Sequence, residues 1–328
     1  MEGYCKMCPV CNGRGCRNQI PGPGAKGTGD TAIRNYDKWK EIRINMDTLT
    51  ERREVCIGTE LFGRKFSAPV FAGPVGAVNM HYGEKYNDLQ YNQILVPACG
   101  EKGIAAFTGD GMDPQVMISA GQVIKSVQGC GVPTIKPWNK EKIDEKLRIA
   151  KESGAFAVAM DVDAAGLPFL KGFQPPAGSK SVAELKKIIA DAEAPFIVKG
   201  IMTPQAALKA KEAGAAAIVV SNHGGRVLDQ CPATAEVLGE ICDAVAGEMK
   251  VLVDGGIRDG VDVFKALALG ADGVLMARPF VNAVYLEGEE GVKKLVDRIS
   301  AELADTMAMC GAYSLSEISR DMLYFPKN

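Results

Sequence analysis

A histidine and an arginine stand close together where an apolar run of the chain ends in a glycine-rich loop. Residues 217–221 read AIVVS and the next five read NHGGR, so His223 and Arg226 are three positions apart. An imidazole can take a proton from a substrate hydroxyl near neutral pH, and a guanidinium can hold a carboxylate through two parallel hydrogen bonds. His223 and Arg226 are therefore candidate catalytic residues. The alternative is that both side chains only tie loops together.

Two other loops join small residues to an arginine. Residues 254–258 read DGGIR, and residues 276–279 read MARP. Small residues let backbone N–H groups approach an anion, while Arg258 and Arg278 add positive charge. The two loops predict a site for one phosphorylated cofactor. Asp254 can accept hydrogen bonds from the ribityl or ribose hydroxyls of such a molecule, and its alternative role is to cap a helix.

A lysine ends another apolar run, because residues 196–200 read FIVKG. The ammonium group of Lys199 can stabilise negative charge that develops on a bound cofactor ring. The alternative is an ordinary surface lysine.

Four of the ten cysteines are crowded near the start of the chain, at Cys5, Cys8, Cys11 and Cys16. Their spacing, C-x2-C-x2-C-x4-C, allows four thiolates to surround one metal centre. Three cysteines at successive x2 intervals resemble part of a ferredoxin iron–sulfur run, whereas structural zinc sites usually have two separated C-x2-C pairs. An iron–sulfur cluster is the favoured interpretation, and structural zinc and free or redox-active thiols are the alternatives. The other six are expected to be buried apolar thiols: Cys56, Cys99, Cys130, Cys231, Cys242 and Cys310.

The elements that must position these residues follow a repeated pattern, in which a short apolar run precedes an amphipathic stretch. From residue 67 onward this pattern predicts eight strands. They are expected at residues 68–72, 104–108, 133–136, 156–161, 196–199, 217–221, 251–254 and 273–276. Helical periodicity separates them, as in residues 142–153 and 181–192, and Thr203 followed by Pro204 predicts a helix start. Such alternation predicts a (β/α)8 TIM barrel, an α/β fold whose chemistry lies at the C-terminal ends of the strands.

Residues 1–66 differ from this repeat. They carry the four clustered cysteines, a Pro/Gly-rich stretch at residues 21–29, and signals for a helix and a small hairpin that ends near Phe66. We expect this Cys-rich N-terminal segment to cap one end of a barrel formed by residues 67–328.

The composition agrees with an α/β enzyme and disfavours other classes. The 328 residues are 47 % apolar and 24 % charged, with a formal net charge of -2. A large core can be buried, and no basic excess points to nucleic acid. The start of the sequence lacks the features of a secretory signal, and no apolar run is long enough to span a bilayer. We therefore expect a cytoplasmic protein with no membrane partner.

Taken in order, the motifs at residues 198–200, 221–229, 254–258 and 277–279 resemble those of the FMN-dependent α-hydroxy-acid oxidase and dehydrogenase family. Glycolate oxidase and lactate oxidase are members of it. The resemblance is close over residues 195–283 and looser back to residue 68. It implies oxidation of a 2-hydroxy acid to the 2-keto acid, with a hydride or its equivalent passing to flavin N5. It also implies a homo-oligomer, specifically a homotetramer.

The resemblance implies roles for individual residues. His223 would be the catalytic base, Arg226 a ligand of the substrate carboxylate, and Asp163 the carboxylate that orients the base. Lys199 would lie beside flavin N1, and Asp254 on the ribityl chain. The residues implied to contact the flavin ring are Ala72, Gly73 and Thr108. Those implied to surround the phosphate are Gly256, Arg258, Ala277 and Arg278.

The chain departs from the family pattern around the substrate. Members usually carry one tyrosine in the N-terminal segment and another after the third strand, where residues 134–138 here read TIKPW. The family's threonine two positions before the base-orienting aspartate is here Asp161, and the loop at residues 164–180 lacks the arginine that members often carry. Lys136 either replaces that positive charge or faces solvent. Lys136 and Asp161 are therefore candidate substrate residues, and the identity of the hydroxy acid stays open.

A metal cluster close to the flavin would give electrons an exit other than dioxygen. This favours a dehydrogenase over an oxidase, with an unknown electron acceptor. One alternative function is an FMN barrel with chemistry like that of type 2 isopentenyl diphosphate isomerase, against which the HGGR motif argues. The other is a flavin and metal protein that carries or senses electrons without turning over a small substrate.

Overall fold

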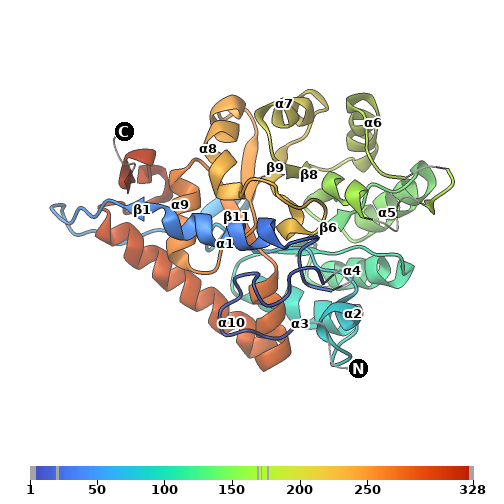
Figure 1. Ribbon diagram of the computed structural model, residues 1–328, viewed down its shortest axis with the longest axis horizontal. Coiled ribbons are helices and arrows are strands. Elements are labelled where there is room, and N and C mark those ends of the chain that lie inside the picture. Colours follow the sequence, from blue (N-terminus) through green and yellow to red (C-terminus); the bar gives the residue numbers. More distant parts are fainter. Residues whose placement is uncertain (1–4, 20–21, 168–169, 171, 176, 325–328) are drawn as a thin grey trace.

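The chain folds into a closed barrel of eight parallel strands. Figure 1 shows helices arranged around the strands. The computed structural model describes residues 5–19, 22–167, 170, 172–175 and 177–324. The barrel strands are β4 (Val70–Ala72), β5 (Ala106–Thr108), β6 (Gly131–Ile135), β7 (Val158–Asp161), β8 (Phe196–Ile201), β9 (Ala217–Val220), β10 (Lys250–Val253) and β11 (Gly273–Met276). The ring closes where β11 pairs with β4. The TIM-barrel prediction is confirmed, and every strand lies within two residues of its expected bounds.

Helices connect the strands and cover the outside of the barrel (Figure 1). They are α2 (Val78–Tyr82), α3 (Asp88–Glu101), α4 (Pro114–Ser126), α5 (Lys140–Glu152), α6 (Val182–Ala192), α7 (Pro204–Glu212), α8 (Thr234–Val245), α9 (Gly260–Ala268) and α10 (Arg278–Met309). As predicted, Thr203 caps α7, because its Oγ1 accepts a hydrogen bond from the Ala206 N–H at 3.1 Å. Short 3-10 turns follow β7 and β9 as η1 (Val162–Gly166) and η3 (His223–Gly225). Within the described ranges, no helix is both long enough and apolar enough to cross a membrane.

Apolar side chains fill the N-terminal end of the barrel. A hairpin of β2 (Thr59–Leu61) and β3 (Arg64–Phe66) adds two side chains, Leu61 and Phe66, to the inner layer of strand residues. The Phe66 ring lies 5.1 Å from that of Phe71 in β4, measured between centroids. Because this end of the barrel is closed by apolar packing, polar chemistry is confined to the opposite end.

The N-terminal region contacts both ends of the barrel rather than one. While its hairpin closes the N-terminal end, α1 (Asp30–Glu41) lies against the loops at the C-terminal end. The amides of Asn35 and Asn222 exchange two hydrogen bonds, at 2.7 and 2.9 Å. Trp39 is fully buried, and its Nε1 donates to the Gly255 carbonyl at 2.8 Å. Helix α1 therefore fixes the loops that follow β9 and β10.

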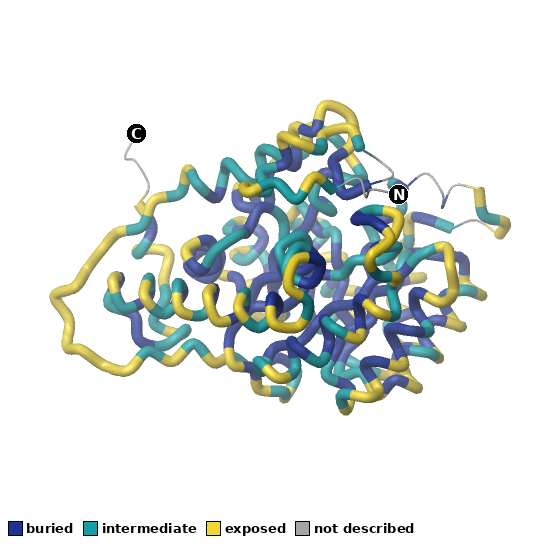
Figure 2. Tube along the Cα trace, turned by 90° about the horizontal axis from the view of Figure 1, so that it is seen from below, coloured by how far each residue is buried: buried dark blue, intermediate teal, exposed yellow. Residues whose placement is uncertain are grey.

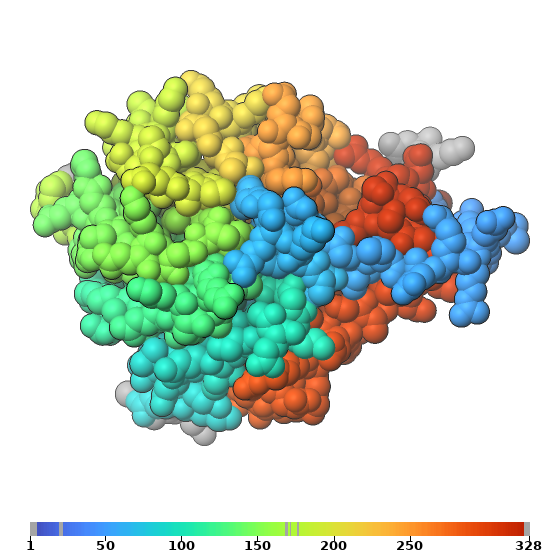
Figure 3. Space-filling model, turned by 180° about the vertical axis from the view of Figure 1, so that it is seen from behind, coloured from blue at the N-terminus to red at the C-terminus, as the bar shows by residue number. Residues whose placement is uncertain are grey.

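The N-terminal region and the C-terminal end of the described chain meet in a short antiparallel pair. Strand β1 (Arg43–Ile44) pairs with β12 (Leu323–Tyr324), which follows the turns η4 (Leu315–Glu317) and η5 (Arg320–Met322). Figure 3 shows the light-blue residues of the N-terminal region beside the red C-terminal residues. Residues 45–54 are exposed and extend from the body as a loop (Figure 2).

The expectation of buried thiols holds for Cys99 and Cys310. Cys56, just after the loop at residues 45–54, is exposed, and the other three scattered cysteines are partly buried.

Candidate active site

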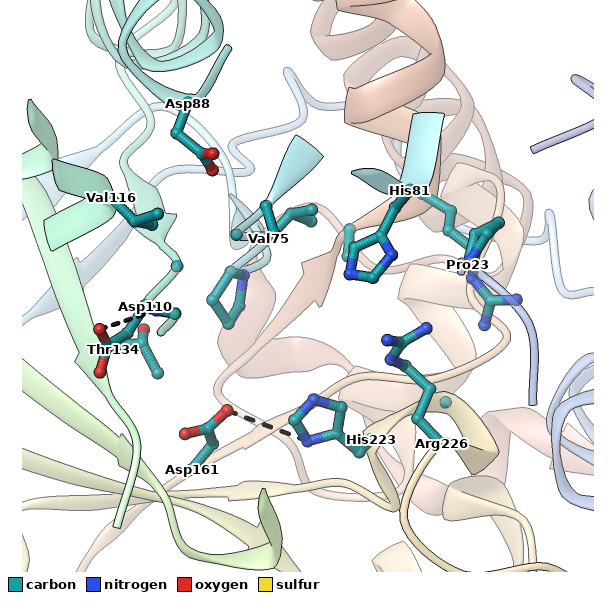
Figure 4. Close-up of a pocket in the computed structure, with 18 of the residues that line it drawn as sticks. Pro23, Val75, His81, Asp88, Asp110, Val116, Thr134, Asp161, His223 and Arg226 are labelled. Atoms are coloured by element: carbon teal, nitrogen blue, oxygen red, sulfur yellow. Dashed lines mark hydrogen bonds and ion pairs between the residues drawn. The ribbon is translucent and has the colours of Figure 1, made fainter. Parts of the chain in front are cut away.

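A cavity of about 770 Å³ opens at the C-terminal end of the barrel. The predicted site residues that line it are Lys136, Asp161, Lys199, His223, Arg226, Asp254, Gly256, Arg258, Ala277 and Arg278. Figure 4 shows the side chains of Asp161, His223, Arg226 and His81 directed into the same space. The structure therefore brings together, in one cavity, residues that come from separate strand ends.

His223 follows β9 in a left-handed backbone conformation, with φ of 55°. Its backbone N–H donates to Ser221 Oγ at 3.1 Å. Its ring Nδ1 lies 3.0 Å from Asp163 Oδ1 and 3.9 Å from Asp161 Oδ2. Because Nδ1 faces these carboxylates, Nε2 is the nitrogen left for a substrate.

The two carboxylates beside His223 differ in their pKa. Burial raises the pKa of Asp163, but the charges of His223 and Lys199 outweigh it, and the pKa is lowered overall. For Asp161, burial outweighs the charges of Lys136 and His223, and the pKa is raised. Asp163 is also packed against Gly200, where an added Cβ would lie 2.6 Å from its Cγ. Asp163 is therefore the carboxylate held ready to accept a hydrogen bond from the Nδ1–H group.

Lys136 is largely withdrawn from solvent, since its side chain is only 12 % exposed. Its Nζ lies 3.2 Å from Asp161 Oδ2, and its backbone N–H donates to Asp110 Oδ2 at 3.0 Å. The ligand atoms of Asp161, Asp163 and His223 lie within 4.8 Å of one another. The ammonium groups of Lys136 and Lys199 beside them would repel a cation, so this group suits acid–base chemistry better than metal binding.

Lys199 is buried at the C-terminal part of β8. Its Nζ donates to Ser221 Oγ at 2.9 Å and lies 3.3 Å from Asp254 Oδ2. Burial lowers the pKa of Lys199, but the charges of Asp254 and Asp163 outweigh it, so the pKa is raised. Lys199 is therefore a fixed positive charge beside the cavity rather than a surface lysine. Asp254 is its ion-pair partner.

Arg226 extends from the residue after η3 toward the N-terminal region. Its NH1 donates to the Gly22 carbonyl and, at 3.4 Å, to that of Gly24. His81 of α2 faces the same part of the cavity, as Figure 4 shows. Burial, followed by the charges of Arg226 and Lys136, lowers the pKa of His81 to about 4. His81 is thus neutral near pH 7, and its Nδ1 has no hydrogen-bond partner in the described part of the chain.

Arg258 and Arg278 both line the cavity and lie near enough for their charges to interact. Burial and the charge of Arg278 lower the pKa of Arg258, as expected for two neighbouring cations. Arg278 is the first residue of α10, and its NH1 is buried without a partner among the described residues. Gly256 has φ of +84°, and a Cβ there would lie 2.1 Å from the Asn35 carbonyl oxygen. A glycine loop, a helix start and two guanidinium groups together suit a phosphate.

The remaining predicted cofactor residues are buried at the ends of β4 and β5, next to residues that line the cavity. Ala72 ends β4, Thr108 ends β5, and the Gly73 N–H donates to the Met276 carbonyl at 2.9 Å. Buried side-chain oxygens with no partner among the described residues include those of Thr108 and Thr134 and one oxygen of Asp254. Buried polar atoms of this kind normally have a hydrogen-bond partner, so they are consistent with a polar ligand.

The cysteine segment, defined as residues 5–16, contacts the loop that carries Arg258. Arg258 Nε donates to the Cys11 carbonyl at 2.8 Å, and its NH2 lies 3.7 Å from Cys11 Sγ. Burial raises the pKa of the Cys11 thiol, but the charges of Arg278 and Arg258 outweigh it and lower the pKa. Cys11 therefore lies beside the same two arginines that suit a phosphate.

The four clustered thiols are near one another but not tightly gathered. The pKa of Cys5 is raised by burial and further by the charges of Cys11, Cys16 and Cys8. In the ranges that the structure describes, no three cysteine Sγ atoms lie within 4.8 Å of one another. A tetrahedral zinc site with Zn–S bonds of about 2.3 Å would place them about 3.8 Å apart. A bound zinc ion would therefore have to draw the thiols together.

The sequence did not predict two features of the cavity. His81 and Tyr82 line it, and the only signal was that His81 is one of just two histidines in the chain. Asp110 is buried and accepts hydrogen bonds at 2.6 Å from both Lys146 Nζ and Trp138 Nε1. Three residues so far apart in sequence form no motif. Asp110 also accepts from the backbone of Lys136 and so fixes the loop after β6.

Comparison with known protein families gives a match to the FMN-dependent dehydrogenase family over residues 23–169 and 172–325. A peroxisomal (S)-2-hydroxyacid oxidase of Arabidopsis thaliana is 31 % identical over 89 % of this chain and 87 % of its own length. An L-lactate oxidase of a Roseobacter species is 48 % identical over 43 % of this chain and 38 % of its own length. A 4-hydroxymandelate oxidase of Amycolatopsis orientalis is 28 % identical over 94 % of this chain and 95 % of its own length.

Solved structures give the same result. A mandelate oxidase variant that holds a monooxide FMN adduct has a TM-score of 0.78 and 29 % identity, covering 93 % of this chain and 94 % of that chain. A mandelate oxidase with (S)-4-hydroxymandelic acid has a TM-score of 0.77 and 26 % identity, covering 92 % of both chains.

Proposed function

This chain belongs to the FMN-dependent dehydrogenase family, and on that premise we propose that it oxidises a 2-hydroxy acid to the 2-keto acid with FMN. The proposal rests on the contact of 3.0 Å between His223 Nδ1 and Asp163 Oδ1. His223 lines the same cavity as Arg226 and the arginine pair, which is Arg258 and Arg278. These are a base, a carboxylate ligand and a phosphate site within one cavity. That set suits proton removal from a carboxylated substrate.

The residues of the cavity fit FMN. The unpartnered oxygens of Thr108, Thr134 and Asp254 match a molecule with ring heteroatoms and a ribityl chain, and the unpartnered NH1 of Arg278 matches its phosphate. Ala72 and Gly73 would contact the ring. Around the phosphate we assign Gly256, Arg258, Ala277 and Arg278. When bound, FMN supplies the acceptor of the two electrons that leave the substrate.

The side chains of the chain itself then have separate tasks. His223 takes the proton of the substrate hydroxyl at Nε2, and its Nδ1–H donates to Asp163, which stabilises the imidazolium that forms. Arg226 holds the substrate carboxylate with guanidinium N–H groups other than those given to the carbonyls of the N-terminal region. Lys199, whose pKa is raised, supplies a permanent positive charge beside the cofactor.

We assign the Lys136 and Asp161 pair to the part of the cavity that contacts the rest of the substrate. Both line the cavity, and Asp161 joins the pair to the base through its 3.9 Å approach to His223. A buried ion pair favours substrates whose side chain offers a polar group. The identity of that hydroxy acid is the first unknown to test.

A dehydrogenase is favoured over an oxidase because a metal centre on the cysteine segment would lie next to the loop of Arg258. For the metal, an iron–sulfur cluster is favoured over zinc, since three of the cysteines follow the ferredoxin spacing.

The test is anaerobic titration of the FMN-loaded protein with a panel of 2-hydroxy acids. At least one of them should bleach the flavin absorption of the wild type. His223→Ala should keep its FMN and lose this bleaching, while Cys56→Ser, an exposed cysteine, serves as the matched control. Retained bleaching in His223→Ala would contradict the assigned base. Reduction of the flavin by a protein donor, and by none of the 2-hydroxy acids, would favour the alternative function of a protein that carries or senses electrons.

The electron acceptor needs a separate measurement. Substrate-reduced protein is mixed with dioxygen in a stopped-flow instrument, and iron and zinc are determined on the same sample. Slow reoxidation with iron bound supports the dehydrogenase. Rapid reoxidation without iron would mean an oxidase.

A further inference from the structure

The cysteine segment contacts the loop of Arg258, the stretch that accepts hydrogen bonds from Arg226, and helix α2. At one side, Cys11 receives hydrogen bonds from Arg258. At the other, Cys16 packs against the stretch that accepts hydrogen bonds from Arg226, since a Cβ at Gly24 would lie only 1.8 Å from the Cys16 carbonyl oxygen. The segment is also tied to α2, because the Cys5 N–H donates to the His81 carbonyl at 3.2 Å. Its position is therefore linked to the cavity at three points.

Arg258 contacts the cysteine segment and also lines the cavity where the FMN phosphate is proposed to bind. Its Nε and NH2 are directed to Cys11, and its NH1 donates to the Ile257 carbonyl at 2.7 Å. Its backbone N–H donates to Asp262 Oδ2 at 3.0 Å, which fixes the start of the side chain. The orientation of this guanidinium is consequently set by where Cys11 lies. A phosphate beside Arg258 and Arg278 would meet a guanidinium already positioned by the cysteine segment.

Metal binding by the four thiols would change the contact between Cys11 and Arg258. A metal centre held by the four thiols would engage Cys11 Sγ, which lies 3.7 Å from Arg258 NH2. That contact would weaken, and the NH2 group of Arg258 would become available to a phosphate. The remaining Cys11 carbonyl contact would be held more firmly, because a metal centre immobilises the segment. Both effects strengthen phosphate binding.

We propose that the cysteine segment forms the outer part of the FMN phosphate site, and that a thiolate-bound metal centre and FMN bind this chain cooperatively through Arg258. The inference rests on the proposed function, because it takes the FMN phosphate as the anion of the arginine pair. Linkage requires the effect to be reciprocal, so FMN must tighten metal binding by the same factor by which the metal tightens FMN binding. The metal centre belongs to the class that prefers soft thiolates, which includes zinc and iron–sulfur clusters.

The experiment measures the dissociation constant of FMN from quenching of its fluorescence by full-length, flavin-depleted protein. Three states are compared under anaerobic conditions: chelator-treated, loaded with zinc, and reconstituted with iron and sulfide. Riboflavin, which lacks the phosphate, is titrated in parallel. We expect at least one metal-loaded state to bind FMN about tenfold more tightly than the chelated state, within the usual range of coupling. Riboflavin should bind equally in all states.

Variants and the reciprocal measurement locate the coupling. Arg258→Gln should weaken FMN binding and abolish its dependence on metal, whereas Cys56→Ser should leave both unchanged. Competition with a chromophoric chelator should show FMN raising the metal affinity of the wild type by the same factor. Equal FMN affinity in all three states, an equal gain for riboflavin, or a failure to bind either metal would each overturn the proposal. Coupled binding without flavin reduction by any 2-hydroxy acid would support it and contradict only the proposed reaction.

Discussion

Replacing Asp163 with asparagine tests whether the carboxylate beside His223 stabilises the proton that the base acquires. The two groups lie 3.0 Å apart, and their side chains are only 16 % and 10 % exposed. At an effective dielectric constant of about 20, a full positive charge at that distance gains about 5.5 kcal/mol from the carboxylate. If about half of the charge has formed in the transition state, the variant loses about 2.7 kcal/mol, which is about a 100-fold slower reaction.

The assay is the rate of flavin reduction by a saturating 2-hydroxy acid in an anaerobic stopped-flow instrument. Asp113→Asn is the matched control, because Asp113 lines the same cavity but caps α4, a position where asparagine serves equally well. It should remain within about twofold of the wild type. FMN content is measured for each variant to exclude loss of the cofactor. A decrease of less than about tenfold in Asp163→Asn would refute the electrostatic reasoning.

Three further variants test other parts of the structure. In the folded protein the pKa of His81 is lowered from 6.5 to about 4. Between pH 4 and pH 6.5 the unfolded chain therefore binds more protons than the folded protein does. The unfolding free energy should therefore fall by about 3 kcal/mol as the pH drops from 6.5 to 4, and urea titrations should show a smaller fall in His81→Gln. Lys146→Met strands the buried Asp110 carboxylate and should reduce the unfolding free energy by about 3 to 5 kcal/mol in urea; an unchanged value would contradict a charged pair. Gly256→Ala should lower the melting temperature and the retained FMN, because its Cβ would meet the Asn35 carbonyl oxygen; normal values of both would disprove the close approach.

The barrel was predictable because its signals are local. Each strand is a short apolar run, and the cap formed by Thr203 and Pro204 appears in the sequence as it does in the structure. The assignment of His223, Arg226 and Lys199 to one cavity followed from a single rule, that the C-terminal ends of barrel strands meet. The prediction needed no knowledge of the distances between these side chains.

What the sequence did not predict depends on contacts between distant residues. Asp110 reaches its partner Lys146 across 36 positions and carries no motif of its own. Rather than solvent, the Lys136 side chain faces the cavity, where its ammonium group pairs with Asp161, which lies 25 positions away in the sequence. The N-terminal region was expected at one end of the barrel because its hairpin and its helix could not be placed separately. Their packing against opposite ends is a tertiary property that composition does not encode.

The contact between Cys11 and Arg258 spans 247 positions, and this separation sets the order of assembly during synthesis. A ribosome that adds about 5 to 20 residues per second needs about 12 to 50 seconds to make the intervening chain. During that interval the cysteines have been made, but the loop that will receive them has not. Metal delivery to the nascent chain and delivery after barrel closure are thus distinct biosynthetic routes. Only the second can be assisted by a flavin that has already bound.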